Sequence, residues 1–488
     1  MPLQITRSNN MFSQCFCFMC AAVFLLFNIA KSQNIESESI LIKGGWYIDL
    51  TQMKKEKNRG ILIQDGLIVS LNYEDQKSLN NLRQINLMDS QTILPGMIDM
   101  HAHYNFDLVD QGRVDEVNFN GMIFLANGVT STWSAGEYNP ERVIKHRDSI
   151  NKGDKIGPRI FNSGPYFGGF RCEYSVKAAE DDCVAWPNDI SEQEIRNEVN
   201  KWAQKGVISI KIKQATPGEA KIIIEEAHKN GMTTAAHLAN YYGEYDVDLR
   251  DAILMGLDRV EHQITLGNGG EKSKEMDQMI DLMIKRKIYY DANLQMYGGI
   301  NLRAQIPDLV WTDESKYFTP YAQSLLKERG DPPPESEEAE FNQRVIELIT
   351  FFEEGGQDLI IVGTDEPVYT TLLPGFAYHR ELYAMQYFGI PAINIIKAAT
   401  INAAKSLGIE DILGSIDVGK EADLVIINGD PISDIRNARN IEFVIKEGVI
   451  YDPATILSSA EGMIGPKNSE EHSAWQLSIE PLLSLIHI

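Results

Sequence analysis

The feature that most constrains the fold is a repeating order of strand, loop and helix through the middle of the chain. Eight strand-like runs lie within roughly 300 residues of this region. They end near His103, Ser134, Tyr166, Lys213, His237, His262, Leu294 and Asp365. Helical stretches such as 192–206 and 218–231 separate most of them. This alternation predicts an α/β protein with a (β/α)8 barrel, whose chemistry lies at the C-terminal ends of the strands.

Two β-rich stretches flank that region, one from about residue 38 and one at 414–452. Both have apolar residues with a period of two, interrupted by Gly, Asn and Asp, which is typical of antiparallel hairpins. The ends of compact units often lie close together, so we predict that the two stretches pair into a small β-sandwich domain. The predicted boundaries are 1–32 (signal peptide), 33–90 and 401–455 (the two parts of the β-sandwich), 91–400 (the barrel) and 456–488 (a C-terminal tail).

The N-terminal segment has the composition of an export signal. Residues 15–30 are uncharged and apolar, and the run is shorter than the roughly 20 residues that a spanning helix needs. Ala30 and Ser32 give the small-x-small pattern of a signal-peptidase site. We therefore predict an exported protein, periplasmic or secreted, with no membrane association after cleavage near Ser32. An uncleaved membrane anchor is the alternative.

Cysteine usage and charge narrow the class of protein further. Three of the five cysteines lie in the predicted signal, which leaves Cys172 and Cys183. An even count in an oxidising compartment predicts a disulfide between them, and two buried free thiols are the alternative. The net charge of −24 argues against a nucleic-acid partner, because phosphates repel an acidic surface.

Histidines gather where the predicted strands end. The run "LPGMIDMHAH" at 94–103 finishes in His101 and His103, which share one face of a strand because side chains alternate in direction. Two imidazoles on one face make half of a zinc-type site. His237, His262 and Asp365 also follow predicted strands. A core histidine satisfied by hydrogen bonds could explain any one of these residues, but it explains all five together poorly.

Lysines on the fourth predicted strand add a second signal. In "GVISIKIKQA", Lys211 and Lys213 lie on one face. Lysine is almost never buried without a partner, so a lysine inside a barrel needs a reason such as a lowered pKa and covalent modification. If His262 faces the site, strand alternation turns Glu261 away and predicts a structural contact for it.

Residues near the strand ends are weaker candidates for substrate contacts. Tyr104, Tyr241 and Tyr242 could contact the substrate, and packing at the rim is the alternative for each. Lys213 could bind a substrate carboxylate, and an exposed solvated charge is the alternative.

Together the segments "PGMIDMHAH", "GVISIKI", "AAHLAN", "VEH" and "VGTDEP" resemble the amidohydrolase superfamily, in particular its imidazolonepropionase-like and prolidase-like (Xaa-Pro dipeptidase) branch. The resemblance runs from about residue 38 to 455. It implies two divalent metal ions, with Zn²⁺ expected, bridged by a CO₂-derived carbamate on Lys211. By the same resemblance His101, His103 and Asp365 hold one metal, and His237 and His262 hold the other. Lys211 matches the family pattern better than Lys213, because it stands five residues after Gly206.

The resemblance also implies an activity. It is metal-dependent hydrolysis of C–N amide bonds, in dipeptides such as Xaa-Pro or in N-acyl amino acids, by a metal-bridging hydroxide. Asp365 would act as general base and then as general acid, with Lys211 the other catalytic residue. Hydrolysis of a cyclic amide, an imidazolone or a lactone is an alternative, and an inactive barrel that acts as a binding protein is an alternative of another class. The expected partner is a small-molecule amide or dipeptide, and assembly into a homo-oligomer stays open.

Overall fold

The computed structural model describes most of the chain from Ser39 onward. It covers residues 39–74, 81–107, 113–137, 139–168, 190–238, 247–265, 270–296, 298, 314–329, 338–366 and 373–477. The predicted signal segment, 1–32, lies outside the described residues. So do the cysteines Cys172 and Cys183 and the candidate substrate residues Tyr241 and Tyr242.

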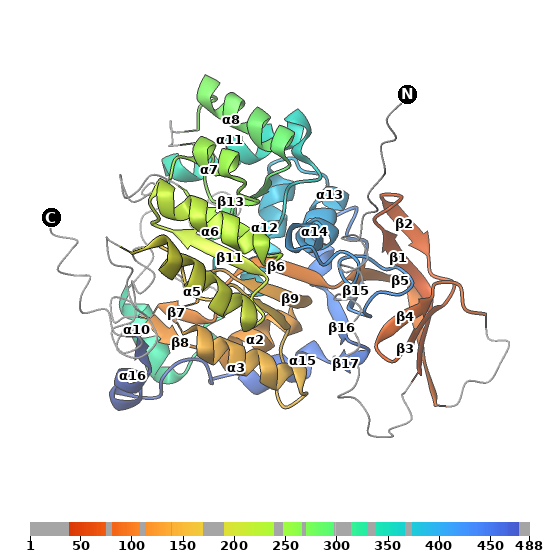
Figure 1. Cartoon of the computed structure of the whole chain (residues 1–488). Helices are drawn as coiled ribbons and strands as arrows, with labels where there is room; N and C mark the ends of the chain where they lie inside the picture. The colour runs from red at the N-terminus through yellow and green to blue at the C-terminus, as the bar shows by residue number, and fades with distance from the viewer. Residues whose placement is uncertain are drawn as a thin grey trace, which may run out of the picture.

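One mixed sheet combines strands from both ends of the described chain. Its order is β17-β16-β15-β5-β1-β3-β4, with β2 paired to β1. The strands are β1 (Ser39–Asp49), β2 (Lys54–Lys57), β3 (Ile61–Gln64), β4 (Leu67–Ser70), β5 (Leu82–Pro95), β15 (Leu424–Asn428), β16 (Ile441–Lys446) and β17 (Val449–Tyr451). Strand β5 joins the two parts, because it runs parallel to β1 and antiparallel to β15. Figure 1 shows this sheet at one side of the molecule.

Apolar residues with a period of two explain this pairing. Ile40 and Ile42 of β1 are buried and belong to the same apolar cluster as Leu424 and Ile426 of β15. Residues two apart on a strand point to the same face, so each strand contributes one apolar face to this cluster. The two flanking stretches therefore pair as expected. Their strands form one mixed sheet, and a β-sandwich stays a prediction.

Two parallel sheets form the central part of the molecule. One has the order β10-β9-β6 and the other the order β11-β12-β13-β14. Their strands are β6 (Met97–Ala102), β9 (Val129–Ser134), β10 (Arg159–Asn162), β11 (Ser209–Lys213), β12 (Thr233–His237), β13 (Arg259–Glu261) and β14 (Tyr289–Asp291). Parallel strands need crossover connections, which are usually helical, and the alternation in the sequence supplies them.

Single parallel bridges connect the edges of these two sheets. Phe167, which follows β10, pairs with Ile212 of β11. On the other side, Tyr290 of β14 pairs with Ile360, and Glu366 pairs with Ala102 of β6. Residues 361–365, where the eighth strand was expected, do not form a regular strand. The described residues thus show an α/β fold, and a closed (β/α)8 barrel stays a prediction.

Helices alternate with the parallel strands and cover them. They are α2 (Val117–Ala126), α3 (Pro140–Asn151), α5 (Glu192–Gln204), α6 (Pro217–Lys229), α7 (Leu249–Met255), α8 (Lys274–Arg286), α10 (Pro320–Arg329), α11 (Glu338–Phe351), α12 (Phe376–Tyr387), α13 (Ala392–Lys397), α14 (Ala403–Leu407) and α15 (Pro453–Ala460). Helices α5 to α8 pack side by side in chain order (Figure 1). Local sequence fixes where α5 and α6 begin, since Ser191 and Thr216 each form a capping box with a glutamate three residues later.

The last described residues also form regular structure. Helix α16 (Ser469–Trp475) is followed by β18 (Gln476–Leu477), which pairs with β8 (Arg113–Asp115), and β8 pairs with β7 (Asn105–Asp107). Part of the predicted tail, 456–488, is therefore folded against the segment after β6. Throughout the described ranges, no helix is both long enough and apolar enough to cross a membrane.

Candidate metal centre

Strand β6 and the residue that follows it supply the first two histidines. His101 and His103 are buried, with 2% and 3% of their surface exposed. Their ring centroids lie 5.3 Å apart. Both Nε2 atoms face Asp365 Oδ1, at 3.3 Å for His101 and 2.8 Å for His103. The two imidazoles thus converge on one carboxylate, consistent with the shared strand face.

Asp365 and His262 reach the same point through an uncommon backbone conformation. Their φ angles are 54° and 69°, in the left-handed region that residues other than glycine rarely adopt. Asp365 Oδ2 lies 3.9 Å from His262 Nε2. One donor atom from each of His101, His262 and Asp365 lies within 4.8 Å of the others, and all three residues are buried. This group can hold a metal ion.

Glu261 also enters the site, so the expectation that it faces away is wrong. It is the last residue of β13 and is buried. Its Oε1 lies 3.4 Å from His101 Nδ1, and its Oε2 accepts a hydrogen bond from Lys211 Nζ. Strand alternation fails here because the positive φ of His262 ends the strand geometry. Both neighbours can therefore point inward, which the sequence pattern alone does not signal.

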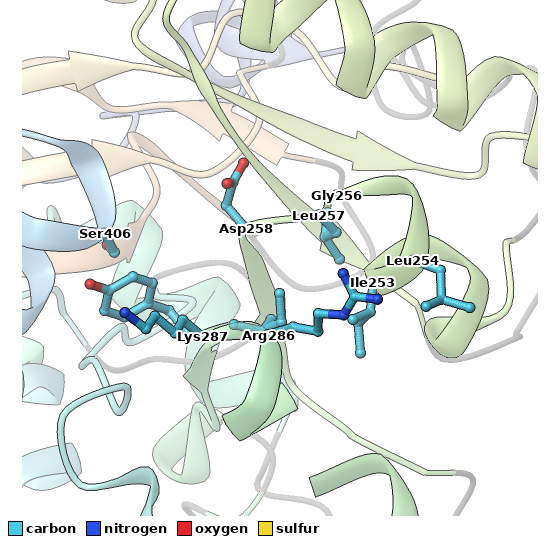
Figure 2. A pocket seen from close by; sticks show the side chains of 10 residues that line it. Ile253, Leu254, Gly256, Leu257, Asp258, Arg286, Lys287 and Ser406 are labelled. Carbon is cyan, nitrogen blue, oxygen red and sulfur yellow. The ribbon is translucent and has the colours of Figure 1, made fainter. Parts of the chain in front are cut away.

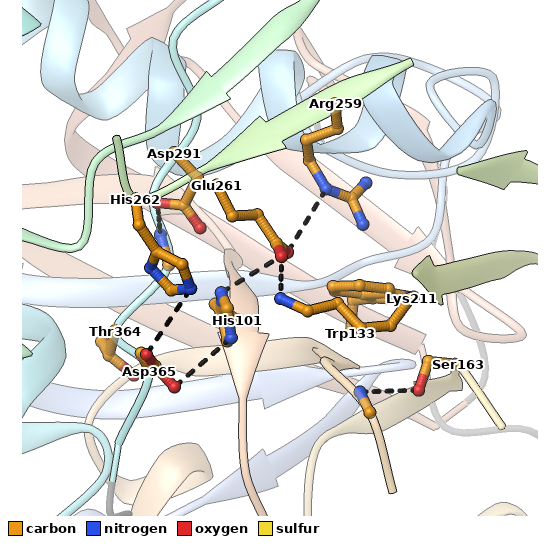
Figure 3. A network of polar contacts seen from close by, with 12 residues as sticks. His101, Trp133, Ser163, Lys211, Arg259, Glu261, His262, Asp291, Thr364 and Asp365 are labelled. Atoms are coloured by element: carbon orange, nitrogen blue, oxygen red, sulfur yellow. Dashed lines mark hydrogen bonds and ion pairs between the residues drawn. The ribbon is translucent and has the colours of Figure 1, made fainter. Parts of the chain in front are cut away.

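Lys211 of β11 points into the interior, toward Glu261 and beside His101 (Figure 3). Its side chain is only 1% exposed. Burial lowers the pKa of Lys211 well below its usual value, which favours the neutral amine. A neutral, buried lysine is the form that covalent modification requires. In the structure its Nζ donates a hydrogen bond to Glu261 Oε2.

His237, the last residue of β12, adjoins His262. The two ring centroids lie 4.4 Å apart. The structure therefore brings His237 to His262, His262 to His101 at 5.0 Å between centroids, and His101 to His103. Four imidazoles predicted from three strand ends form one continuous group.

Burial sets the protonation of these histidines. It lowers the pKa of His101, His237 and His262 well below the usual value. The imidazoles are therefore neutral at physiological pH, which is the form that binds a metal. Neutral imidazoles with one carboxylate are the donor set that a divalent cation such as Zn²⁺ prefers. The residues present thus fit a divalent cation of the kind that the resemblance implies.

Two buried carboxyl groups, Asp99 and Asp291, support the centre through backbone hydrogen bonds, and the sequence pattern does not single them out. Asp99 Oδ1 accepts hydrogen bonds from the backbone N–H of His101 and of Thr364, at 3.0 and 3.1 Å. Asp291 Oδ1 accepts one from Gly363 N at 2.9 Å. Burial raises the pKa of each acid to about 7. They tie β6 and β14 to the segment that carries Asp365. Asp99 lies two residues before His101 on the same strand face, which is the one signal that could have found it.

The weaker candidates have partners within the fold. Tyr104 is 4% exposed, and its hydroxyl lies 2.7 Å from Thr132 Oγ1. Lys213 is partly exposed, with Nζ 5.1 Å from the centre of the Tyr166 ring. A contact of either residue with substrate stays a prediction, as it does for Tyr241 and Tyr242 outside the described residues.

A separate cavity of about 220 Å³ lies at the other end of the parallel strands (Figure 2). Its lining includes Asp258, directly before β13, and Ile288, directly before β14. It therefore opens at the N-terminal strand ends, whereas the candidate metal centre lies at the C-terminal ends. Asp258 is already engaged, accepting hydrogen bonds from Thr234 N and Thr234 Oγ1.

Comparisons with known sequences agree on one family. The sequence pattern described as the amidohydrolase family matches residues 92–451. A stretch of 47 residues is 53% identical to the imidazolonepropionase of Picrophilus torridus, and 78 residues are 40% identical to the 5-methylthioadenosine/S-adenosylhomocysteine deaminase of Teredinibacter turnerae. These stretches cover 10% and 14% of this chain, and only 12% and 17% of those relatives.

Solved structures with the same fold cover far more of the chain. A Xaa-Pro dipeptidase with bound methionine has a TM-score of 0.64 at 24% identity, over 85% of this chain and 100% of its own. Molinate hydrolase has a TM-score of 0.64 at 21% identity, over 89% and 99% of the two chains. Phenylurea hydrolase B has a TM-score of 0.64 at 18% identity, over 88% and 100%. At these identities the similarity establishes the fold.

Proposed function

This chain belongs to the amidohydrolase family, and we propose that it hydrolyses C–N amide bonds with divalent cations held at the candidate metal centre. One observation carries the proposal. Buried donor atoms of His101, His262 and Asp365 lie within 4.8 Å of one another, beside a buried lysine. Neutral imidazoles together with a carboxylate are ligands that a divalent cation such as Zn²⁺ prefers.

Each proposed ligand has a place in this arrangement. His101, His103 and Asp365 would hold one cation, in keeping with the convergence of both imidazoles on Asp365 Oδ1. His237 and His262 would hold a second cation, supported by their ring contact at 4.4 Å. Lys211, carboxylated by CO₂, would bridge the two. The burial and lowered pKa of Lys211 support this assignment.

The chemistry divides between the cations and the chain. Bound divalent cations supply a Lewis acid for the scissile carbonyl and lower the pKa of water. Asp365 lies among the ligands and is 7% exposed, so its carboxylate is placed to accept a proton from the attacking water. The same carboxyl would then deliver that proton to the leaving nitrogen. The buried walls exclude bulk water and strengthen these electrostatic interactions.

We further propose a dipeptide, such as Xaa-Pro, or an N-acyl amino acid as substrate. The Xaa-Pro dipeptidase structure supports this choice, since it shares the fold over most of this chain. Hydrolysis of a cyclic amide is a second candidate, favoured by the 47-residue stretch shared with an imidazolonepropionase.

The proposal extends to the architecture. Bridges from Phe167 to Ile212, from Tyr290 to Ile360 and from Ala102 to Glu366 support a ring of eight parallel segments, as a (β/α)8 barrel requires. The boundaries 33–90, 91–400 and 401–455, export by a signal at 1–32, and the Cys172–Cys183 disulfide are part of the same proposal.

Metal analysis and substrate profiling of the purified protein test the function. We expect close to two divalent cations per chain and hydrolysis of members of a dipeptide and acyl-amino-acid panel. A chelator should abolish this activity and Zn²⁺ should restore it. Asp365→Asn should remain folded and inactive, while the matched control Glu226→Gln, on the outer helix α6, should keep activity. A chain that binds no cation, or that hydrolyses amides equally well after chelation, would contradict the proposal.

A further inference from the structure

We propose that Glu261 is a positioning residue, which orients both the carboxylated Lys211 and the His101 ring toward the cations; this rests on the proposed function. Figure 3 shows its carboxylate at the centre of a buried network, between the side chains of Lys211, His101 and Arg259. Its side chain is fully buried. A buried carboxylate in contact with two proposed ligand residues is placed to decide how each of them is presented.

The first contact fixes the lysine. Glu261 Oε2 accepts a hydrogen bond from Lys211 Nζ. Carboxylation starts from the neutral amine. The nitrogen lone pair forms a bond to the carbon of CO₂, one C=O π pair moves onto oxygen, and one of the two amine protons leaves to water. The product keeps a single N–H, and Glu261 Oε2 already occupies the position that accepts a hydrogen bond from this nitrogen.

That remaining N–H determines where the carbamate points. A carbamate is planar by the same resonance that flattens a peptide group, so the direction of its N–H fixes the plane and the side on which its oxygens lie. With the N–H donated to Glu261, the carbamate oxygens turn away from Glu261. They are thereby free to bind cations, and repulsion between two carboxylate groups favours the same orientation.

The second contact fixes the histidine. His101 Nε2 faces Asp365 at 3.3 Å, and His101 Nδ1 faces Glu261 Oε1 at 3.4 Å. Among the described residues Nδ1 has no hydrogen-bond partner, and 3.4 Å is slightly longer than a good hydrogen bond. A proton on Nδ1, donated to Glu261, leaves the Nε2 lone pair for a cation. Histidine ligands usually donate their second N–H to such an acceptor.

Arg259 supplies a positive charge beside Glu261 once Lys211 has been carboxylated. Its Nε lies 4.0 Å from Glu261 Oε1, and its guanidinium lies 4.1 Å from the centre of the Trp133 ring. Before carboxylation, Lys211 adds no negative charge beside Glu261. Once Lys211 has become an anion, Arg259 and the bound cations must balance two buried negative charges, since unpaired buried charges are costly.

Substituting Glu261 separates this role from that of a plain buried ion pair. Glu261→Gln keeps the shape of the side chain and removes its charge. Glu261→Asp keeps the charge that pairs with Lys211, and so preserves folding, but is too short to contact Lys211 and His101 together. Glu226→Gln is the matched control, because Glu226 is also a buried carboxylate, which lies on helix α6 and pairs with Arg196.

The readouts are cation affinity and the ¹³C NMR signal of the carbamate after incubation with ¹³C-bicarbonate. We expect both Glu261 variants to lose roughly 10–100-fold in cation affinity, the usual effect of removing an outer partner of a ligand. The carbamate signal should fall in parallel, and kcat should drop with little change in KM. Glu226→Gln should match the wild type in all three.

The outcomes also separate this inference from the proposed function. Wild-type protein that holds cations and a carbamate, with both signals unchanged in Glu261→Gln and Glu261→Asp, would overturn the role of Glu261 alone. Wild-type protein with neither cations nor carbamate would overturn the proposed function, and the role of Glu261 with it.

Discussion

At the scale of single residues, the backbone at the strand ends decides which side chains enter the site. Glu261 and His262 are neighbours, yet both point inward, because His262 has a φ of 69°. Asp365 also has a positive φ, of 54°. Non-glycine residues in such conformations store strain that persists only where surrounding contacts hold it, often at functional sites. The centre is thus built from residues whose backbone is constrained by the fold.

Replacement of Lys211 tests the bridge directly. Lys211→Ala should lower kcat by more than the roughly 10–100-fold that loss of an outer partner costs, because it removes the proposed link between two cations. Small carboxylic acids such as propionate should restore part of the activity by taking the place of the carbamate. Steady-state kinetics with and without the acid measure both effects.

Lys229→Ala is the control for that experiment, since Lys229 lies on the outer face of α6 and pairs with Glu226. It should leave kcat unchanged. If Lys211→Ala retained full activity, Lys211 would have no part in the centre.

At the scale of elements, close packing ties the segment before Asp365 to its neighbours. A Cβ added at Gly363 would lie 2.1 Å from Asp291 Oδ2 and 2.6 Å from His101 Cβ. Glycine is required there because the backbone passes directly against the two residues. Through Gly363 N and Thr364 N, this segment also donates hydrogen bonds to Asp291 and Asp99.

Gly363→Ala should therefore damage both stability and metal binding. Overpacking of a buried site typically costs about 1–3 kcal/mol of unfolding free energy. The added Cβ should also displace His101, which should lower the cation affinity. Gly218→Ala is the control, because a Cβ at Gly218 in α6 meets nothing within 4 Å. Urea unfolding and metal titration measure the two effects. If the two variants had the same unfolding free energy and the same cation affinity, the segment would have space for a Cβ at position 363.

Helix α12 is tied to the C-terminal end of α2 by a histidine with an unusually low pKa. His379 Nε2 donates to the carbonyl oxygen of Asn127 at 2.9 Å. Burial lowers the pKa of His379 to about 3, compared with about 6.5 in an unfolded chain. Between pH 6.5 and 3 the unfolded chain therefore binds a proton that the folded chain excludes, so the stability of the fold declines as pH falls through this window.

His379→Gln should remove this pH dependence, because glutamine keeps a donor but does not titrate. Relative to the variant, the wild type should lose up to about 1.4 kcal/mol of unfolding free energy for each pH unit below 6.5. Urea unfolding at pH 7.5, 6.0 and 5.0 gives the difference. A difference that stays constant over this range would mean that His379 takes up a proton as readily in the folded protein as in the unfolded chain.

At the scale of the whole molecule, one sheet joins residues that are more than 300 positions apart. Leu424 of β15 pairs with Pro95 of β5, and β5 pairs with β1. The side chains of Ile42, Leu424 and Ile426 lie in one buried cluster. Strands β1 and β15 should therefore be stabilised together.

Ile426→Ala tests that coupling. Removing a buried isoleucine should cost about 2–5 kcal/mol, and amide hydrogen exchange should accelerate in β1 as well as in β15. Val418→Ala, an exposed position in the same part of the chain, should change neither. Faster exchange confined to β15 would contradict a jointly stabilised sheet.

The sequence by itself determined the class of fold and the residues offered to the site. The spacing of apolar residues is local, so it predicted the alternation of strands and helices and the strand ends near His101, His237 and His262. Alternation along one strand also gave the shared face of His101 and His103. Family membership followed from the same segments, since the amidohydrolase pattern matches 92–451.

Only the tertiary structure decided which groups meet. The inward turn of Glu261, its contacts with Lys211 and His101, and the support from Asp99 and Asp291 depend on strands that are distant in sequence. Local periodicity fixes directions within one strand, but it carries no information on the distance between two strands or on the torsion where a strand ends. Those are set by packing, which brings Gly363 against β6 and holds His262 and Asp365 in their left-handed conformations.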